Sequence, residues 1–199
     1  MHISNTPALW QLAWQLLESA AHSGDGGFAR PVIATSGPES IGPRGRIVVL
    51  RGAEREASTL TFYTDLRSLK IDQLTANPSI AWTFWDAERR LQCCAGGTAR
   101  VPLDHTRDAV FADLPKHGRR AYATIQPPGT PLSGPGSGLP ADWDDRDLAD
   151  TRYARENLAI VHTELQWADM LQLDREGNTR LTAVREAAGL PWSFTYVVP

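Results

Sequence analysis

Cysteine is scarce in this sequence. Cys93 and Cys94 are the only two cysteines among 199 residues, and they are adjacent. Because neighbouring residues of a strand point to opposite faces, this pair favours neither a disulfide framework nor a metal site. We therefore expect two free thiols, and we assign no metal ligand to any residue.

Long apolar runs and long basic runs are also absent from the sequence. No apolar run approaches the roughly 20 residues that a membrane-spanning helix needs, and the first residues lack the basic start, apolar core and small-residue cleavage site of a secretion signal. The 20 lysine and arginine residues against 23 aspartate and glutamate residues give a formal net charge of −3. We expect a cytoplasmic protein that binds neither nucleic acid nor a membrane.

Length and composition indicate one domain. Hydrophobic residues make up 42% of the 199 residues, which predicts a single globular domain over residues 1–199. Apolar residues recur at helical spacing near the start of the chain and predict an N-terminal helix at about residues 8–21. Proline and glycine are frequent at about residues 126–140, where we expect an exposed loop rather than a domain linker.

β-Branched and aromatic residues form many short runs between turn residues. Short connections between such strands, with few helices, favour an antiparallel sheet that closes or partly closes into a barrel. Gly96 and Gly97 lie within one of these runs and predict a bulge or a tight bend. The candidate strands cover residues 28–35, 46–51, 59–65, 79–85, 91–101, 158–163, 167–173, 179–184 and 192–198.

A short helix is predicted directly after the strand that ends at Asp65. Such a helix start presents free backbone N–H groups and the positive end of the helix dipole to an anion, and Arg67, Ser68 and Lys70 lie near it. Together with Arg46, these residues predict a phosphate site. Charged residues at strand ends and helix starts are also typical of solvated surface, so spacing alone leaves both interpretations open.

Four motifs occur in order along the chain: Arg46-x-Val48-x-Leu50-Arg51, Phe62-Tyr63-Thr64-Asp65, Arg67-Ser68-x-Lys70 and Gln92-x-x-x-x-Gly97. Their order and spacing resemble those of the pyridoxamine-phosphate oxidase family. The resemblance implies a mainly β fold with flanking α-helices, namely a six-stranded antiparallel split β-barrel of the FMN-binding type. It also implies a homodimer that holds FMN at the subunit interface and acts on a small-molecule substrate. The flavin carries the chemistry, so no catalytic side chain is assigned.

The resemblance also assigns cofactor-binding residues. Arg46 and Lys70 would neutralise the FMN phosphate, and the hydroxyl groups of Thr64 and Ser68 would form hydrogen bonds to the same end of the cofactor. The other implied cofactor-binding residues, including two valines at the flavin edge and a glutamine that contacts the ring, are Val48, Val49, Tyr63, Arg67, Gln92 and Gln126.

The resemblance is less complete on the substrate side. Arg51 takes the position of the family's substrate-binding lysine and offers a planar fork in place of a point charge. Arg180 matches the arginine of the family's Arg-x-His motif, whereas Thr182 stands in place of the histidine. Leu171 replaces a tryptophan that contacts the flavin. The tyrosine, arginine and serine that grip the substrate phosphate have no counterpart at matching spacing, and the nearby residues that could substitute are Lys116, Arg119, Arg120 and Tyr122.

Three functions are compatible with these residues. The first is an FMN-dependent oxidoreductase, with oxidation of pyridoxamine phosphate as its narrower form. The second is a non-catalytic flavin-binding or sensing protein, which keeps the phosphate-binding residues without the substrate residues. The third is a split barrel with another ligand such as haem, for which His105, His117 and His162 would be candidates.

Overall fold

One antiparallel sheet organises the described part of the chain. The structure is a computed structural model that describes residues 6–37, 42–102 and 104–199, and the other positions of the domain expected over 1–199 lie outside the described residues. The strands are β1 Val32–Ser36, β2 Pro43–Ile47, β3 Leu50–Glu54, β4 Thr59–Asp65, β5 Ser79–Asp86, β6 Leu91–Arg100, β7 Leu158–Gln172, β8 Thr179–Val184 and β9 Ser193–Val197. The helices are α1 Ala8–Ser23, α2 Leu69–Ala76, α3 Thr106–Asp113 and α4 Lys116–Arg119, with 3₁₀-helices η1 Arg120–Tyr122 and η2 Ala149–Asn157.

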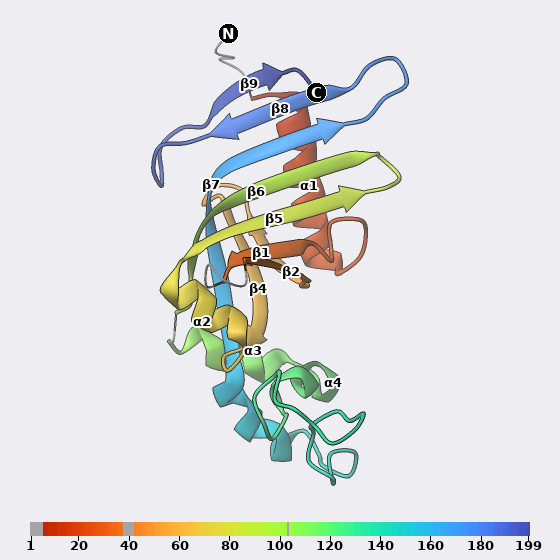
Figure 1. The fold of residues 1–199 in the computed structure, drawn as a ribbon, viewed down its shortest axis with the longest axis vertical. Helices are drawn as coiled ribbons and strands as arrows, with labels where there is room; N and C mark the ends of the chain where they lie inside the picture. The colour runs from red at the N-terminus through yellow and green to blue at the C-terminus, as the bar shows by residue number, and fades with distance from the viewer. Residues whose placement is uncertain (1–5, 38–41, 103) are drawn as a thin grey trace.

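Strand β7 joins the two halves of the sheet. The strands follow the order β2-β1-β5-β6-β7-β4-β3, and β8 and β9 extend from β7 as a hairpin. The first half of β7 pairs with β4 and its second half with β8, while β6 runs along its other edge. The sheet therefore curls into an open half-barrel with helices beside it (Figure 1). This confirms the predicted mainly β, antiparallel fold with flanking helices.

The bulge predicted in β6 is also confirmed. The pairing of β6 with β7 shifts register between Gly96 and Gly97. A Cβ atom at Gly97 would collide with the carbonyl oxygen of Glu164 on β7, so glycine is required for this close approach. The bulge allows β6 to follow the bend of β7.

The number of strands differs from the six that the family resemblance implied. The sheet contains nine strands within the described residues. One reason is that the strand expected at 46–51 is divided, because β2 pairs with β1 whereas β3 pairs with β4. Val48 and Val49 form the crossing between them, and the Val48 amide donates to the carbonyl of Pro31 at 3.0 Å. An apolar run in the sequence does not reveal where a strand changes its partner.

The strands expected at 158–163 and 167–173 are joined in the structure. They form the single 15-residue strand β7, and the polar residues between them do not interrupt it. Pairing with β6 continues on both sides of that stretch. The C-terminal hairpin of β8 and β9 then adds two further strands at the edge of β7.

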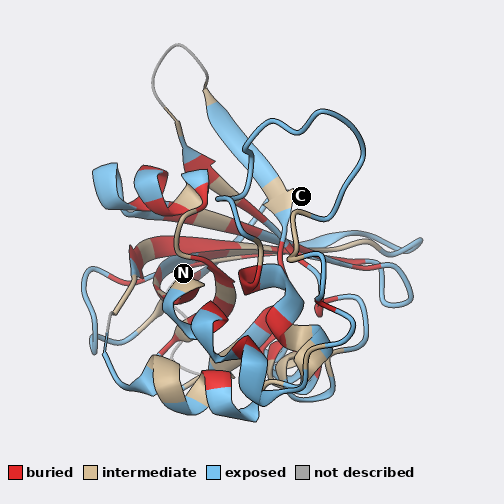
Figure 2. Cartoon of the chain, turned by 90° about the horizontal axis from the view of Figure 1, so that it is seen from below, coloured by how far each residue is buried: buried red, intermediate tan, exposed pale blue. Residues whose placement is uncertain are grey.

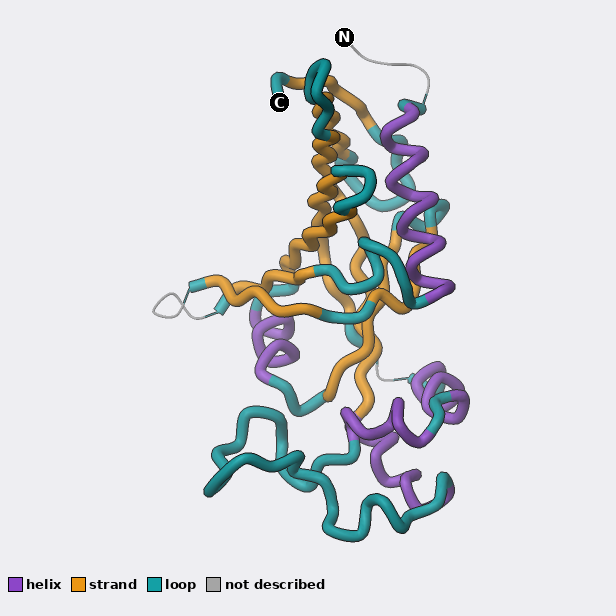
Figure 3. The backbone as a smooth tube through the Cα atoms, turned by 90° about the vertical axis from the view of Figure 1, so that its right-hand side faces the viewer, coloured by secondary structure: helices purple, strands orange, loops and turns teal. Residues whose placement is uncertain are grey.

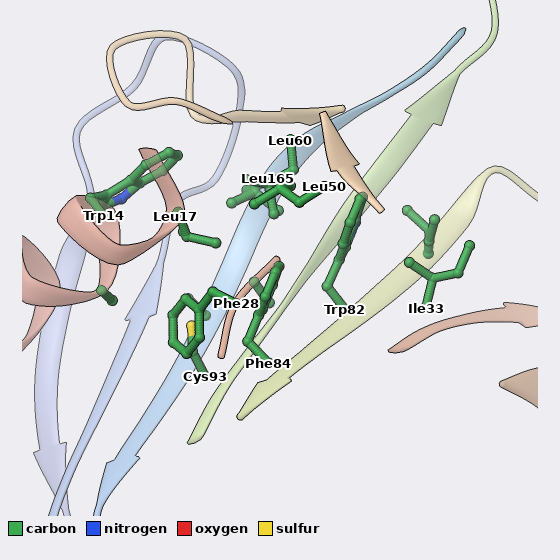
Figure 4. Close-up of a cluster of buried hydrophobic side chains, with 14 of the residues drawn as sticks. Trp14, Leu17, Phe28, Ile33, Leu50, Leu60, Trp82, Phe84, Cys93 and Leu165 are labelled. Atoms are coloured by element: carbon green, nitrogen blue, oxygen red, sulfur yellow. The ribbon is translucent and has the colours of Figure 1, made fainter. Parts of the chain in front are cut away.

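Helix α1 covers one face of the sheet and buries a core of aromatic residues. The helix expected at 8–21 is confirmed, and it ends at Gly24, which adopts a left-handed conformation with φ 70°. Trp14 points toward the strands, where Trp82 and Phe84 are fully buried (Figure 4). Burial of such side chains contributes about 1.5–3 kcal/mol each. No helix in the described ranges is long and apolar enough to cross a membrane.

The two cysteines are free, as expected. Cys93 points into the core near Phe28 and Phe84 (Figure 4), and burial raises the pKa of its thiol to about 12. Cys94 lies on the opposite face of β6 and is partly exposed. The Cys93 thiol is therefore not available as a thiolate at neutral pH.

A second, smaller hydrophobic cluster lies beyond the end of β7 that is remote from both termini. It is built from α3, η1, η2 and the connections between them (Figure 3). The connections at this end are mostly exposed, whereas buried residues gather along the strands and the inner sides of the helices (Figure 2). Residues 126–140 contain neither helix nor strand. The buried members of the cluster are Phe111, Tyr122, Ala123, Trp143, Ala154 and Leu158.

Candidate functional site

A cavity of about 560 Å³ lies between the sheet and the second hydrophobic cluster. We call it the cation cavity because three cationic side chains line it. Strands β2, β3 and β4 and the start of α2 supply one wall, and α4, η1 and the following loop supply the other. The sheet-side residues are Arg46, Ile47, Val48, Val49, Arg51, Tyr63, Thr64, Asp65, Ser68 and Lys70, and the opposite residues are His117, Gly118, Ala121, Tyr122 and Pro128.

Lys70 lies in the first turn of α2 and points at two hydroxyl groups. Its Nζ donates to Thr64 Oγ1 at 2.8 Å and to Ser68 Oγ at 3.1 Å. Ser68 is the N-cap residue of α2, yet its hydroxyl makes no capping hydrogen bond. Burial, reinforced by the charge of Arg46, lowers the pKa of Lys70. The ammonium group is thus partly desolvated beside hydroxyl groups that can also bind an anion.

Arg46 on β2 is fixed in place by neutral oxygens. Its guanidinium donates to Thr35 Oγ1 at 2.7 Å, to the carbonyl of Arg44 at 2.6 Å and to Gln73 Oε1 at 2.7 Å. Thr35 also donates to Gln73 Oε1 at 2.6 Å, so the three side chains form one network. Burial, followed by repulsion from Arg44, lowers the pKa of Arg46.

The positive charge of Arg46 and Lys70 has no acidic partner among the described residues. Their hydrogen bonds go to hydroxyl, carbonyl and amide oxygens. The acidic residue in the lining, Asp65, is engaged by Arg67, whose Nη2 lies 2.7 Å from Asp65 Oδ2. Two partly buried cations that repel each other favour an anion between them. The cavity is therefore suited chemically to a phosphate or carboxylate group.

The remaining part of the lining combines one cation with two phenol rings. The Arg51 guanidinium carbon lies 5.8 Å from the centre of the Tyr63 ring. Burial raises the pKa of Tyr63, and it raises the pKa of Tyr122 to about 12. Both phenols are therefore protonated at neutral pH and can donate a hydrogen bond. Arg51, Tyr63 and Tyr122 can together contact a flat molecule that carries negative charge.

Comparisons with known proteins all find similarity to pyridoxine/pyridoxamine 5′-phosphate oxidases. Residues 10–102 match the family model described as pyridoxamine 5′-phosphate oxidase, FMN-binding domain. A pyridoxine/pyridoxamine 5′-phosphate oxidase from Alcanivorax borkumensis is 32% identical over 92 residues, which are 46% of this chain and 42% of that protein. Another from Porphyromonas gingivalis is 29% identical over 129 residues, 65% of this chain and 58% of that protein. The matches thus span about half the length of these curated relatives.

Solved structures share the fold at lower sequence identity. A pyridoxamine 5′-phosphate oxidase-related, FMN-binding protein from Nostoc punctiforme has a TM-score of 0.73 and 23% identity, covering 99% of this chain and 100% of its own. PhzG from Burkholderia lata, in complex with tetrahydrophenazine-1-carboxylic acid, has a TM-score of 0.67 and 16% identity, covering 95% and 91%. The chain therefore shares the fold of these proteins, and residues 10–102 are similar to the FMN-binding domain of pyridoxamine 5′-phosphate oxidases.

The split barrel brings most of the predicted cofactor residues to the cation cavity. The predicted substrate residue Arg51 also lines it. Arg67 lies outside the lining. Its guanidinium pairs with Asp65 and donates to the carbonyl of Thr124 at 3.1 Å, and the hydrogen bond to Asp65 raises the pKa of Arg67.

Seven of the ten predicted cofactor residues line the cation cavity: Arg46, Val48, Val49, Tyr63, Thr64, Ser68 and Lys70. The three that do not line it are Arg67, Gln92 and Gln126.

Gln92 and Arg180 lie together on the sheet, apart from the cation cavity. In the strand register Leu171 of β7 pairs with Gln92 of β6 on one side and with Arg180 of β8 on the other. Paired residues share a face, so these three side chains form one row. Arg180 donates to Asp169 at 2.9 and 2.6 Å, and this interaction raises the pKa of Arg180. We call Gln92, Leu171 and Arg180 the sheet row.

Gln126 and Thr182 also lie outside the cation cavity. Gln126 is an exposed loop residue whose carbonyl accepts a hydrogen bond from Thr124 Oγ1 at 2.9 Å. Thr182 donates its hydroxyl to the carbonyl of Thr195 at 3.2 Å. Of the residues considered as substitutes on the substrate side, Tyr122 lines the cavity, whereas Lys116, Arg119 and Arg120 do not.

The motifs do not include Gln73, and the sequence indicated His117 only as a candidate for another ligand such as haem. Gln73 follows Lys70 by three residues, so helical spacing could have placed both on one side of α2. Its Oε1 holds Arg46, while its buried Nε2 has no hydrogen-bond partner among the described residues. His117 enters the lining because α4 packs beside the sheet, and no periodic pattern in the sequence indicates that packing.

Proposed function

We propose that this chain binds FMN in the cation cavity and acts as an FMN-dependent oxidoreductase on a small molecule. The observation that carries the proposal is the pair of cations, Arg46 and Lys70, which share the cavity with the hydroxyl groups of Thr64 and Ser68. Both cations bind neutral oxygens in the described structure. The phosphate of FMN would supply the missing negative charge.

The residues present fit a flavin phosphate. Lys70 and Arg46 would bind its oxygens through charge-assisted hydrogen bonds, and Thr64 and Ser68 would complete the cradle. Gln73 fixes the direction of the Arg46 guanidinium through a hydrogen bond of 2.7 Å. The family model that matches residues 10–102 is an FMN-binding domain, which supports the same ligand.

The chain's own residues would orient the substrate rather than react with it. Bound FMN would supply the redox chemistry by accepting a hydride from the substrate and passing electrons to oxygen or another acceptor. Arg51 would hold an anionic group of the substrate, and the protonated hydroxyl groups of Tyr63 and Tyr122 would donate hydrogen bonds. Val48 and Val49 would exclude water from the flavin edge.

The substrate is proposed only as a class, a small amine or a related molecule. Curated relatives that match part of the chain are named pyridoxine/pyridoxamine 5′-phosphate oxidases, which supports this class. Thr182 and Leu171 replace residues that the oxidase uses, so oxidation of pyridoxamine phosphate itself is the narrower form of the proposal. Oxygen uptake together with formation of pyridoxal phosphate by flavin-loaded protein tests that form directly.

We also infer that the protein is cytoplasmic and forms a homodimer with FMN at the subunit interface. The sheet row contains Gln92 and Arg180, predicted as ligand-binding residues, and does not line the cation cavity of its own chain. A second protomer could bring its own row to that cavity. Apolar side chains are exposed on the sheet at Trp85 and Trp167, which are 45% and 38% exposed. Light scattering of the purified protein tests the dimer, and a monomeric mass with FMN bound contradicts it.

A non-catalytic flavin-binding or sensing protein is the second candidate. Two features favour it, because both reduce the groups available to a substrate. Thr182 stands where the family motif has a histidine, and Arg180 is paired with Asp169. This candidate predicts FMN binding without turnover of any small amine. Sustained reduction of the bound flavin by an amine would exclude it.

The decisive experiment for FMN binding compares matched variants. Lys70→Met removes one charge-assisted contact, which contributes about 1.5–3 kcal/mol, so we expect FMN affinity to fall roughly ten- to hundredfold. Arg175→Gln removes an exposed positive charge in the turn between β7 and β8 and should leave the affinity unchanged. Fluorescence titration of the flavin measures both, and equal affinity in the two variants would contradict the proposed site.

A further inference from the structure

A second cavity, of about 810 Å³, lies between α3 and η2. It is separated from the cation cavity by α4, since His117 and Gly118 line the cation cavity whereas Arg119 lines the second one. No lining residue is shared by the two. We call it the arginine cavity, and its lining residues are Asp108, Phe111, Ala112, Arg119, Leu148, Ala149, Arg152, Tyr153 and Arg155.

Helix η2 presents two arginines to the arginine cavity. In a 3₁₀-helix, side chains three residues apart lie above one another, so Ala149, Arg152 and Arg155 share one face. Arg155 Nε lies 3.5 Å from Asp108 Oδ1 on α3. Arg152 is exposed and makes no hydrogen bond or ion pair within the described ranges. Its charge is therefore available to a ligand.

Arg119 adds a buried positive charge to the same cavity. The residue is 4% exposed, and its guanidinium carbon lies 4.4 Å from the centre of the Phe111 ring. Its hydrogen bonds go to the carbonyls of Ala112, Leu114 and Leu148 and to the hydroxyl of Thr151. Burial, followed by repulsion from Arg152, lowers the pKa of Arg119. Three arginines face one aspartate in the lining, which leaves an excess of positive charge.

The rim of the arginine cavity is apolar. Leu148 and Tyr153 are 46% and 41% exposed, and Phe111 lies below them under the Arg119 guanidinium. The hydroxyl of Tyr153 is fixed to the carbonyl of Ala123 at 2.8 Å, which holds the ring in place. Cavities that bind small molecules typically have volumes of about 300–1,000 Å³ and combine apolar walls with a few polar groups. The arginine cavity has both properties.

We propose that the arginine cavity binds a small organic anion that carries its charged group on an apolar ring. Arg152 and Arg155 contact the anionic group, and Leu148 and Tyr153 contact the ring. The site is distinct from the proposed FMN site, and the inference does not depend on FMN binding. Phosphate, sulfonate and carboxylate groups share the required chemistry.

Calorimetry with 1-naphthalenesulfonate as the probe tests this site on the full chain. We expect saturable binding with one site per chain, both without FMN and with FMN in excess. Arg152→Gln should weaken it about tenfold or more, because a charge-assisted hydrogen bond is lost. Arg175→Gln, which removes an exposed charge elsewhere, should have no effect. Arg155→Gln provides a second variant and should weaken binding in the same direction.

Three results would overturn the proposal. The first is no saturable binding up to millimolar probe. The second is equal affinity of the Arg152→Gln and Arg175→Gln variants. The third is displacement of the probe by FMN, because that result would place the probe in the cation cavity. Failure of FMN to bind would count against the proposed function alone, since the probe titration without FMN is independent of it.

Discussion

The two walls of the cation cavity are held in place in different ways. The sheet wall, residues 46–70, is fixed by strand pairing and carries Arg46 and Lys70, whose hydrogen bonds go to neutral oxygens. The opposite wall, residues 117–128, consists of most of α4, the short helix η1 and a loop. It is fixed by three side chains that donate to its backbone: Asn157 to Tyr122 at 2.7 Å, Tyr153 to Ala123 at 2.8 Å and Arg67 to Thr124 at 3.1 Å.

This difference separates affinity for an anion from support of the cavity. The sheet wall carries positive charge that costs stability until an anion binds. The opposite wall depends on hydrogen bonds that stabilise the fold itself. Variants in the sheet wall should therefore change ligand affinity, whereas variants in the contacts of the opposite wall should change stability and local order.

The largest effect is expected for Arg67→Met. The substitution leaves the carboxylate of Asp65, whose side chain is 4% exposed, without its partner, and it releases the backbone at Thr124. Breaking such a buried pair costs about 3 kcal/mol of unfolding free energy. Hydrogen exchange should increase in residues 122–128. Urea unfolding and hydrogen-exchange mass spectrometry measure the two effects.

Arg89→Met is the matched control for that prediction. Arg89 also pairs with a buried aspartate, Asp86, at 3.0 Å, but it is 45% exposed and does not line the cation cavity. It should lower stability less and leave exchange in residues 122–128 unchanged. Equal hydrogen exchange in residues 122–128 of both variants would contradict the proposal that Arg67 holds this segment in place.

Gln73→Glu should add a negative charge to the sheet wall and so stabilise it without a ligand. A carboxylate at this position would lie near the Arg46 guanidinium, which now bonds to Gln73 Oε1 at 2.7 Å. We expect the flavin-free protein to gain about 1 kcal/mol of stability and FMN affinity to fall about tenfold, because the new anion competes with the phosphate. Parallel thermal unfolding and flavin titration check this. A gain in both quantities would contradict it.

The pH dependence of stability should reveal Lys70. Its folded-state pKa is lowered, first by burial and then by Arg46, so the folded protein releases this proton at lower pH than the unfolded chain. The unfavourable contribution of the charged Lys70 to folding stability is fully present below the lowered pKa, and it disappears as pH rises toward 10.5, the ordinary value. Without flavin, wild-type stability should therefore rise relative to Lys70→Met in this alkaline window. Urea unfolding over that range measures the difference, and parallel curves would contradict the prediction.

Arg51→Gln should give the smallest effect and one confined to the substrate. Arg51 is exposed and lies over Tyr63, away from the contacts of Lys70 with Thr64 and Ser68. We expect KM for an anionic substrate to rise about fivefold, with FMN affinity unchanged. Steady-state kinetics on any substrate that is turned over measures this. A loss of FMN with an unchanged KM would reassign Arg51 to the cofactor.

The sequence predicted the parts of the site that depend on local patterns. The helix start predicted that Ser68 and Lys70 would form a site with Arg46, the family resemblance added Thr64, and the glycine pair predicted the bulge at Gly97. The division of residues 46–51 between β2 and β3 could not be predicted, because it depends on which strand lies on each side. Residues 117–128 have no periodic pattern, so packing alone brings Tyr122 and His117 into the lining.

The sheet row shows a further limit of sequence reasoning. Gln92 and Arg180 are 88 positions apart in the sequence, yet both pair with Leu171. The resemblance placed Gln92 at the cofactor and Arg180 at the substrate, whereas both lie outside the cation cavity of this chain. A motif alone therefore does not determine whether its residues reach the same cavity.

The most direct test of the account compares FMN with riboflavin, which has the same ring system and no phosphate. Arg46, Lys70, Thr64 and Ser68 would all contact the phosphate, so FMN should bind at least about a hundredfold more tightly. That preference should disappear in the Arg46→Gln, Lys70→Met double variant. Equal binding of FMN and riboflavin by the wild-type protein would contradict the central claim that the cation cavity is a phosphate site.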